Sequence, residues 1–281
     1  MTGKALIGMV VIAGLAFVAS CDKSDPVADA AAIRELVAAD TTHFQSGTAG
    51  DSAENPVPLD DTTIGLWWRG PQTHDPQATI EVNVSGDSAW VGWHQSNYGE
   101  LIHWVKTSDS TSVRWIKELT ERVQLNAVFR REGGVAESDR GWVLERFSLA
   151  HGKSDTTNTA HIDSLRIAST LRNVLIVDPL NTYYLLDSLV TFNPGEQLTI
   201  TLYTNKPDGL AFLHAFWGVL LVRMPFTHQG DGVFSGVWNA QVIPGFRFAI
   251  FDLITEATLL DPVAPYDHNG WLFPYAIETA D

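Results

Sequence analysis

Two histidines and a group of tryptophans are the residues of this chain that could do chemistry together. His94 and His103 fall on neighbouring predicted strands, close to Trp90, Trp93 and Trp104. Because histidine titrates near neutral pH, either ring could act as a general acid or base, and the indole rings would form an apolar wall for a ligand. The alternative is that the tryptophans fill a core and the histidines are partly solvated residues of a sheet.

A short segment upstream, Trp67-Trp68-Arg69, could close the same pocket. The Arg69 guanidinium would then hold an anionic group, because arginine binds carboxylates and phosphates through two parallel hydrogen bonds. The alternative is that the segment is the end of a helix that packs on the sheet. The candidate pocket therefore consists of Trp68, Arg69, Trp90, His94 and His103.

No other motif of the sequence predicts a catalytic residue, a cofactor or a metal site. The glycines are scattered rather than gathered in a phosphate-binding loop, no Gly-x-Ser-x-Gly motif occurs, and no histidine pair has zinc-site spacing. Asp60-Asp61 would begin a helix more simply than it would bind a cation. The polar turn from Tyr266 to Trp271 is expected to have a structural role.

Composition and charge exclude one class of partner. The chain has 18 basic and 33 acidic residues, a formal net charge of −15, and Arg130-Arg131 is its only adjacent basic pair. Nucleic-acid-binding proteins need clustered lysine and arginine, so nucleic acid is not a predicted partner. Apolar residues make up 45% of the chain and include ten tryptophans, which is enough to build cores.

Changes in periodicity predict the elements that would position the candidate pocket. Asp25-Pro26 indicates a helix start, and apolar residues recur at helical spacing from Val27 to Phe44. A short second helix is predicted over residues 60–68. From Thr79 the period changes to two, which predicts an antiparallel meander. Its expected strands cover residues 80–84, 88–95, 101–106, 119–129 and 142–151.

That order of elements, over residues 28–153, resembles the NTF2-like (SnoaL-like) fold, a curled sheet that closes on its helices around a conical pocket. The segment Ala127 to Gly133, its polar loop and Gly141 to Leu144 are similar to the last hairpin of that family. The resemblance implies an α+β domain, which in this family carries enzymes and non-enzymes alike. It also implies that two copies could pair through their sheets as a homodimer.

Residues 160–281 show one short strand signal after another, separated by turns, which is typical of a β-sandwich. The segment Phe192-Asn193-Pro194-Gly195-Glu196-Gln197-Leu198-Thr199-Ile200 resembles the turn and strand of bacterial immunoglobulin-like domains. The predicted fold class is therefore α+β followed by all-β, with an immunoglobulin-like β-sandwich over residues 160–281.

The N-terminal residues have the pattern of an export signal. Lys4 precedes an apolar run from Ala5 to Val18, and Val18-Ala19-Ser20-Cys21 resembles the lipobox of bacterial lipoproteins. The resemblance implies cleavage before Cys21, the only cysteine of the chain, and acylation of its thiol. An ordinary secretory signal with a chance cysteine is the alternative. We expect a signal peptide over residues 1–20, a lipidated tether over 21–27, and a location in the cell envelope, on the periplasmic or outward-facing side of a membrane.

Two functions follow as hypotheses. The preferred one is a membrane-anchored binding or display module without enzymatic activity, whose partner is an envelope protein, a glycan or a small apolar ligand. The alternative is an enzyme whose NTF2-like pocket does acid/base chemistry, of the isomerase, cyclase or hydrolase type, on a small hydrophobic molecule. The alternative requires His94 or His103 to face a cavity beside a carboxylate.

Overall fold

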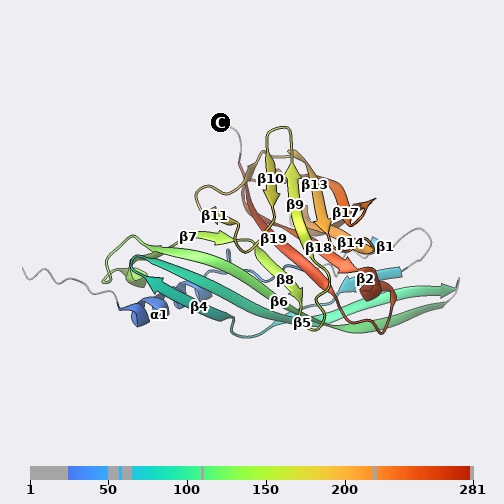
Figure 1. The fold of residues 1–281 in the computed structure, drawn as a ribbon, viewed down its shortest axis with the longest axis horizontal. Coiled ribbons are helices and arrows are strands. Elements are labelled where there is room, and N and C mark those ends of the chain that lie inside the picture. Colours follow the sequence, from blue (N-terminus) through green and yellow to red (C-terminus); the bar gives the residue numbers. More distant parts are fainter. Residues whose placement is uncertain (1–24, 50–56, 59–64, 109–110, 218–219, 279–281) are drawn as a thin grey trace, which may run out of the picture.

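The fold is built on one long hairpin whose residues alternate between two faces. In the computed structural model, β5 (Ser88–Ser108) and β6 (Thr111–Arg131) pair from Ser88↔Arg130 to Ser108↔Thr111. The structure describes residues 25–49, 57–58, 65–108, 111–217 and 220–278, with the backbone alone at 57–58, 65–66, 105–108, 111–112, 217 and 220. Figure 1 shows the hairpin as the base of the molecule, with strands of the C-terminal half above it.

The large sheet has the strand order β1-β2-β5-β6-β8-β19-β18-β14-β15, and further short strands pair along its length. Its remaining strands are β1 (Val57–Pro58), β2 (Gly65–Arg69), β3 (Thr73–His74), β4 (Thr79–Ser85), β7 (Trp142–Ser148), β8 (Ala150–Ser154), β11 (Tyr183–Leu185), β12 (Thr191–Phe192), β14 (Gly209–Trp217), β15 (Leu220–Pro225), β18 (Gly245–Thr255) and β19 (His268–Ile277). The five strands of the second sheet, in the order β10-β9-β13-β17-β16, are β10 (Asn173–Ile176), β9 (Ile162–Ala168), β13 (Gln197–Thr204), β17 (Val233–Asn239) and β16 (Thr227–Gly230).

The prediction of an α+β, NTF2-like N-terminal domain is wrong, because the described residues are mostly strands. The α-helices among them are α1 (Pro26–Ala39) and α2 (Glu256–Leu260), and a 3-10 turn, η1, covers Ser138–Gly141. The described part of the predicted second helix, Gly65–Arg69, is strand β2, which pairs with β5 from Gly65↔Val105 to Arg69↔Leu101. Cross-strand pairing there outweighs the local helix signal, since strand preference depends strongly on tertiary context.

Helix α1 begins as predicted and ends earlier than predicted. The Asp25 side chain accepts hydrogen bonds from the backbone N–H groups of Val27 and Ala28, which makes it the N-cap. The helix ends at Ala39 instead of Phe44 because Asp40 turns the chain: its Oδ1 accepts from the N–H groups of Thr42 and His43, at 3.1 and 3.0 Å. Residues 45–49, after this turn, have no helical structure.

Strand β8 joins the two halves of the chain into one sheet. On one edge it pairs with β6 (Ser154↔Glu121), and on the other edge with β19 (Gly152↔Gly270). The same sheet therefore contains strands from residues 28–153 and from residues 160–281. The division of the chain into two domains with these bounds stays a prediction. The predicted signal peptide and lipobox lie outside the described residues.

The large sheet separates two apolar layers. Its inner face, defined by Val91, Leu125 and Ile250, packs against Ile33 and Val37 of α1. On the opposite, outer face, β14, β18 and β19 pack against the five-stranded sheet, and Phe251 and Trp271 belong to the shared core. Two sheets packed face to face over this part are compatible with the predicted β-sandwich, whereas the immunoglobulin-like resemblance stays a prediction. Among the described residues, no helix has both the length and the apolar character needed to cross a membrane.

Candidate functional site

The five residues of the predicted pocket lie on both faces of the large sheet. Arg69 and His103 occupy the inner face and are fully buried, whereas Trp68, Trp90 and His94 are half-buried on the outer face. The structure therefore does not bring the five together. It does bring Trp90 and His94 together, since a Cβ atom at Gly92 would contact both side chains.

Among the described residues, no carboxylate interacts with His103 as acid/base chemistry would require. Its ring stacks on Trp115 with centroids 3.6 Å apart, and its two nitrogens have no hydrogen-bond partner within the described part of the chain. Burial and then the charge of Lys117 lower the pKa of His103 to about 3. The ring is therefore neutral at pH 7, and it contributes to packing.

Arg69 instead lies at the centre of a buried ionic network that the sequence analysis did not identify. Its Nη1 and Nη2 donate to Oδ2 and Oδ1 of Asp252 at 2.7 and 3.0 Å, a bidentate pair, and its Nε donates to the Tyr266 hydroxyl at 2.9 Å. Burial alone would raise the pKa of Asp252, but the Arg69 charge outweighs it and holds that pKa far below its usual range. The anionic group that Arg69 was predicted to bind is therefore the carboxylate of Asp252, in the same chain.

Two histidines complete the surroundings of Asp252. His214 Nε2 lies 3.1 Å from Oδ2, and His268 Nε2 lies 3.3 Å from Oδ1. Burial lowers the pKa of His214 and lowers that of His268 to about 3. Both rings are neutral at pH 7, so Arg69 supplies the positive charge that balances Asp252.

Glu121 forms the second half of the network and holds a covering segment, residues 46–49, which we call the strap. The Thr48 hydroxyl donates to Glu121 Oε1, and Asn97 Nδ2 donates to both Glu121 Oε2 and the Ser46 carbonyl, at 3.1 and 2.9 Å. Burial raises the pKa of Glu121 to about 7. The strap lies so close to the sheet that a Cβ atom at Gly152 would be 1.8 Å from Thr48 Oγ1.

The network is sealed from solvent. Arg69, His214, Asp252 and His268 are 0% exposed, and Glu121 is 1% exposed. Within the described residues, no group of three or more histidine, cysteine, aspartate or glutamate side chains is arranged to hold a metal ion. Because no substrate can reach these groups, we interpret the network as a structural device that fixes the strap on the sheet.

An apolar cavity beside the strap is the site that a ligand could enter. It has a volume of about 640 Å³, and we call it the Phe246 cavity. The cavity is lined by Thr41, Thr42, Gln45, Gly47, Phe216, Leu221, Phe246, Arg247, Phe248, Ile250 and Leu272. Phe246, Phe248 and Ile250 are alternate residues of β18, so their side chains share the inner face.

Aromatic contacts fix the shape of this cavity. The Phe246 ring lies 4.8 Å from Phe248, 5.1 Å from His43 and 6.3 Å from Phe147, centroid to centroid. The polar wall comes from the turn after α1, where Gln45 Nε2 donates to the carbonyls of Thr41 and Thr42. The cavity thus has an ordered apolar floor and a polar edge.

A comparison of the chain with protein-family models, with curated proteins and with solved structures finds no match.

Proposed function

We propose that the protein is a lipid-anchored module of the cell envelope that binds a small apolar ligand in the Phe246 cavity. The observation that supports this function most directly is the cavity itself, whose floor consists of phenylalanine, leucine and isoleucine side chains. Its volume of about 640 Å³ falls in the range of ~300–1,000 Å³ that is typical of small-molecule sites.

The chemistry of the lining favours an apolar ligand over a polar one. A polar molecule would lose its hydrogen bonds to water on entering, and the aromatic floor could not replace them. An apolar molecule would instead remove its own surface and that of Phe216, which is 39% exposed, from water. Thr41 and Thr42 at the edge can bind one polar group and so orient the ligand.

The described residues favour binding over catalysis. Asp252 and His268, whose pKa values are strongly lowered, belong to the sealed network and cannot contact a substrate. The enzymatic hypothesis requires His94 or His103 to face a cavity beside a carboxylate. His103 is fully buried against Trp115, whereas His94 lines a polar groove together with Asp75 and Glu81, so the enzymatic alternative depends on His94 alone.

The anchor is the second part of the proposal. Val18-Ala19-Ser20-Cys21 has the spacing of a lipobox, and Cys21 is the only cysteine of the chain. One acyl chain gives only marginal membrane binding, whereas the two or three of a bacterial lipoprotein give stable attachment. Cys21→Ser should abolish the incorporation of labelled palmitate and release the chain from membranes, and continued labelling would contradict this assignment.

A titration with an apolar fluorophore tests the cavity. The full chain would be titrated with N-phenyl-1-naphthylamine, with a detergent blank subtracted. Leu221→Trp puts a larger side chain into the cavity, so it should weaken binding of the fluorophore by at least about tenfold, or ~1.4 kcal/mol. Val237→Trp is the matched control, because Val237 is 62% exposed on β17, outside the cavity. Equal affinities of the two variants would refute the assignment.

A further inference from the structure

The outer face of the hairpin carries a second surface of different chemistry. Trp90 and Gly92 are alternate residues of β5, and a Cβ atom at Gly92 would lie 2.8 Å from Cη2 of the Trp90 indole. The same position is 3.5 Å from His94 Nε2. The indole therefore extends over Gly92 towards His94, and only a glycine leaves room for it there.

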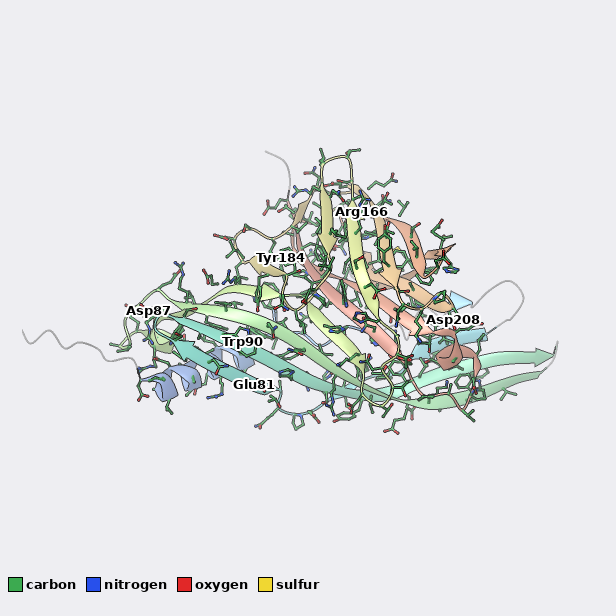
Figure 2. The ribbon with its side chains drawn as sticks, in the orientation of Figure 1. Glu81, Asp87, Trp90, Arg166, Tyr184 and Asp208 are labelled. Atoms are coloured by element: carbon green, nitrogen blue, oxygen red, sulfur yellow. The ribbon has the colours of Figure 1, made fainter. Side chains whose placement is uncertain are left out.

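Polar side chains of the neighbouring strands lie near this indole, although the residue of β6 directly opposite Trp90 is Val128. On β4, Asn83 pairs with Trp90 and Glu81 pairs with Gly92, and both side chains are exposed. On β6, Gln124 pairs with His94. Figure 2 shows Glu81 and Trp90 on the two adjacent strands, below the C-terminal strands. We call Glu81, Asn83, Trp90, His94 and Gln124 the Trp90 platform.

The platform continues into a groove of about 670 Å³. The groove is lined by Asp75, Gln77, Thr79, Glu81, His94, Gln95, Ser96, Arg122, Val123, Gln124, His151, Lys153 and Leu180. Its lining contains two carboxylates, Asp75 and Glu81, and two cations, Arg122 and Lys153. Arg122 also forms an ion pair with Asp155. Burial lowers the pKa of His151 to about 4, so this ring adds no charge at pH 7. The groove has many hydrogen-bonding groups and little net charge.

We propose that the Trp90 platform and its groove bind a neutral glycan. One face of a pyranose ring presents C–H groups, which pack on the electron-rich face of an indole. The hydroxyl groups around the ring then need donors and acceptors, which Glu81, Asn83 and Gln124 supply. A purely apolar ligand would leave these groups unpaired, and the balanced charge gives no attraction for a polyanion.

This site is separate from the Phe246 cavity, which lies on the inner face. If the protein lies in the cell envelope, as the proposed function has it, a glycan bound here would come from a wall polymer or from a capsular glucan. The shared chemistry is a chain of hexopyranose rings, and the linkage and the N-acetyl group distinguish the two sources. Two probes represent them: the β-1,4-linked tetramer of N-acetylglucosamine and maltotetraose.

Isothermal titration calorimetry of the full chain, in a detergent without a sugar headgroup, tests the proposal. One of the two tetrasaccharides should bind, and Trp90→Ala should weaken that binding by about tenfold, the size of a strong aromatic contact. Trp104→Ala is the matched control, because Trp104 is on the same face of β5 and is 45% exposed. This control should bind the glycan like the unchanged chain.

Gly92→Ala keeps the tryptophan, but its methyl group displaces the indole from the strand, so this variant should also weaken glycan binding. Trp90→Phe keeps an aromatic ring and should retain part of the binding. These two variants keep the test valid if Trp90→Ala does not fold. Binding of N-phenyl-1-naphthylamine should be the same in all of these variants, which separates this site from the proposed apolar one. Failure of both tetrasaccharides to bind, or equal affinities of Trp90→Ala and Trp104→Ala, would overturn the proposal.

Discussion

Replacing Glu121 by glutamine should change the stability of the protein in a manner that depends on pH. The carboxyl group is buried beneath the strap, and burial raises its pKa from 4.5 to about 7. The unfolded chain releases this proton near pH 4.5, whereas the folded chain retains it up to about pH 7. Between these values the unfolded state binds fewer protons, so Glu121 makes the free energy of unfolding fall as the pH rises.

The size of the effect follows from the two pKa values. The interval from 4.5 to about 7 corresponds to about 3 kcal/mol, at 1.36 kcal/mol for each pH unit. Glutamine at position 121 has no proton to release, so the variant escapes this loss. The free energy of unfolding of Glu121→Gln, minus that of the unchanged chain, should therefore rise by about 3 kcal/mol between about pH 4 and pH 8.

Urea unfolding followed by tryptophan fluorescence, repeated across this pH range, measures the difference. Glu118→Gln is the matched control, because Glu118 lies on the same strand with its side chain exposed, and its difference should stay constant. A constant difference would mean that folding leaves the pKa of Glu121 unchanged, and a difference that falls with pH would mean that the ionised carboxylate stabilises the folded protein. Either result would refute the reasoning.

Two further predictions concern the same region. Asp252→Asn leaves the buried Arg69 guanidinium without its charge partner and should cost about 3–5 kcal/mol of unfolding free energy; Asp155→Asn, which breaks the exposed pair with Arg122, should cost less than about 1 kcal/mol. Chemical denaturation of the two variants checks this contrast, and similar losses would contradict it. Gly152→Ala should lower the melting temperature sharply because its methyl group would overlap the strap, whereas Gly47→Ala, with open space around its Cβ position, should leave the melting temperature unchanged.

Local patterns in the sequence were enough to predict individual elements. The Asp25 cap and the start of α1 are confirmed, because capping involves only neighbouring residues. The alternation from Leu119 to Phe129 is confirmed as part of β6. The helix predicted over residues 60–68 is wrong where the structure describes it, because pairing with the distant strand β5 determines the conformation of Gly65–Arg69.

The buried network was only partly visible in the sequence. Glu121 stands between Leu119 and Val123 on the inward face of a strand, and Asp252 stands between Ile250 and Ile254 in the same way. Each pattern signals a buried carboxylate that needs a partner. The identity of the partner could not be predicted, because Arg69 and Asp252 are far apart in the sequence and meet only through the order of strands in the large sheet.

The cavity could not be predicted from local sequence patterns either. The alternation of apolar residues at Phe246, Phe248 and Ile250 is the pattern of any strand with one apolar face, and it does not indicate a cavity. Helix α1 ends at Ala39, and the turn that follows supplies Thr41, Thr42 and Gln45 to the lining of the cavity. The early helix end depends on one side chain, and periodicity alone predicted that the helix would continue.

Native mass spectrometry of the full chain, purified from the cells that produce it, tests the proposed function most directly. If the Phe246 cavity holds a small apolar ligand, the spectrum of the unchanged chain should contain a bound molecule that is absent from Leu221→Trp and present in Val237→Trp. Identical spectra for all three proteins, with no bound molecule beyond the lipid on Cys21, would contradict the proposal.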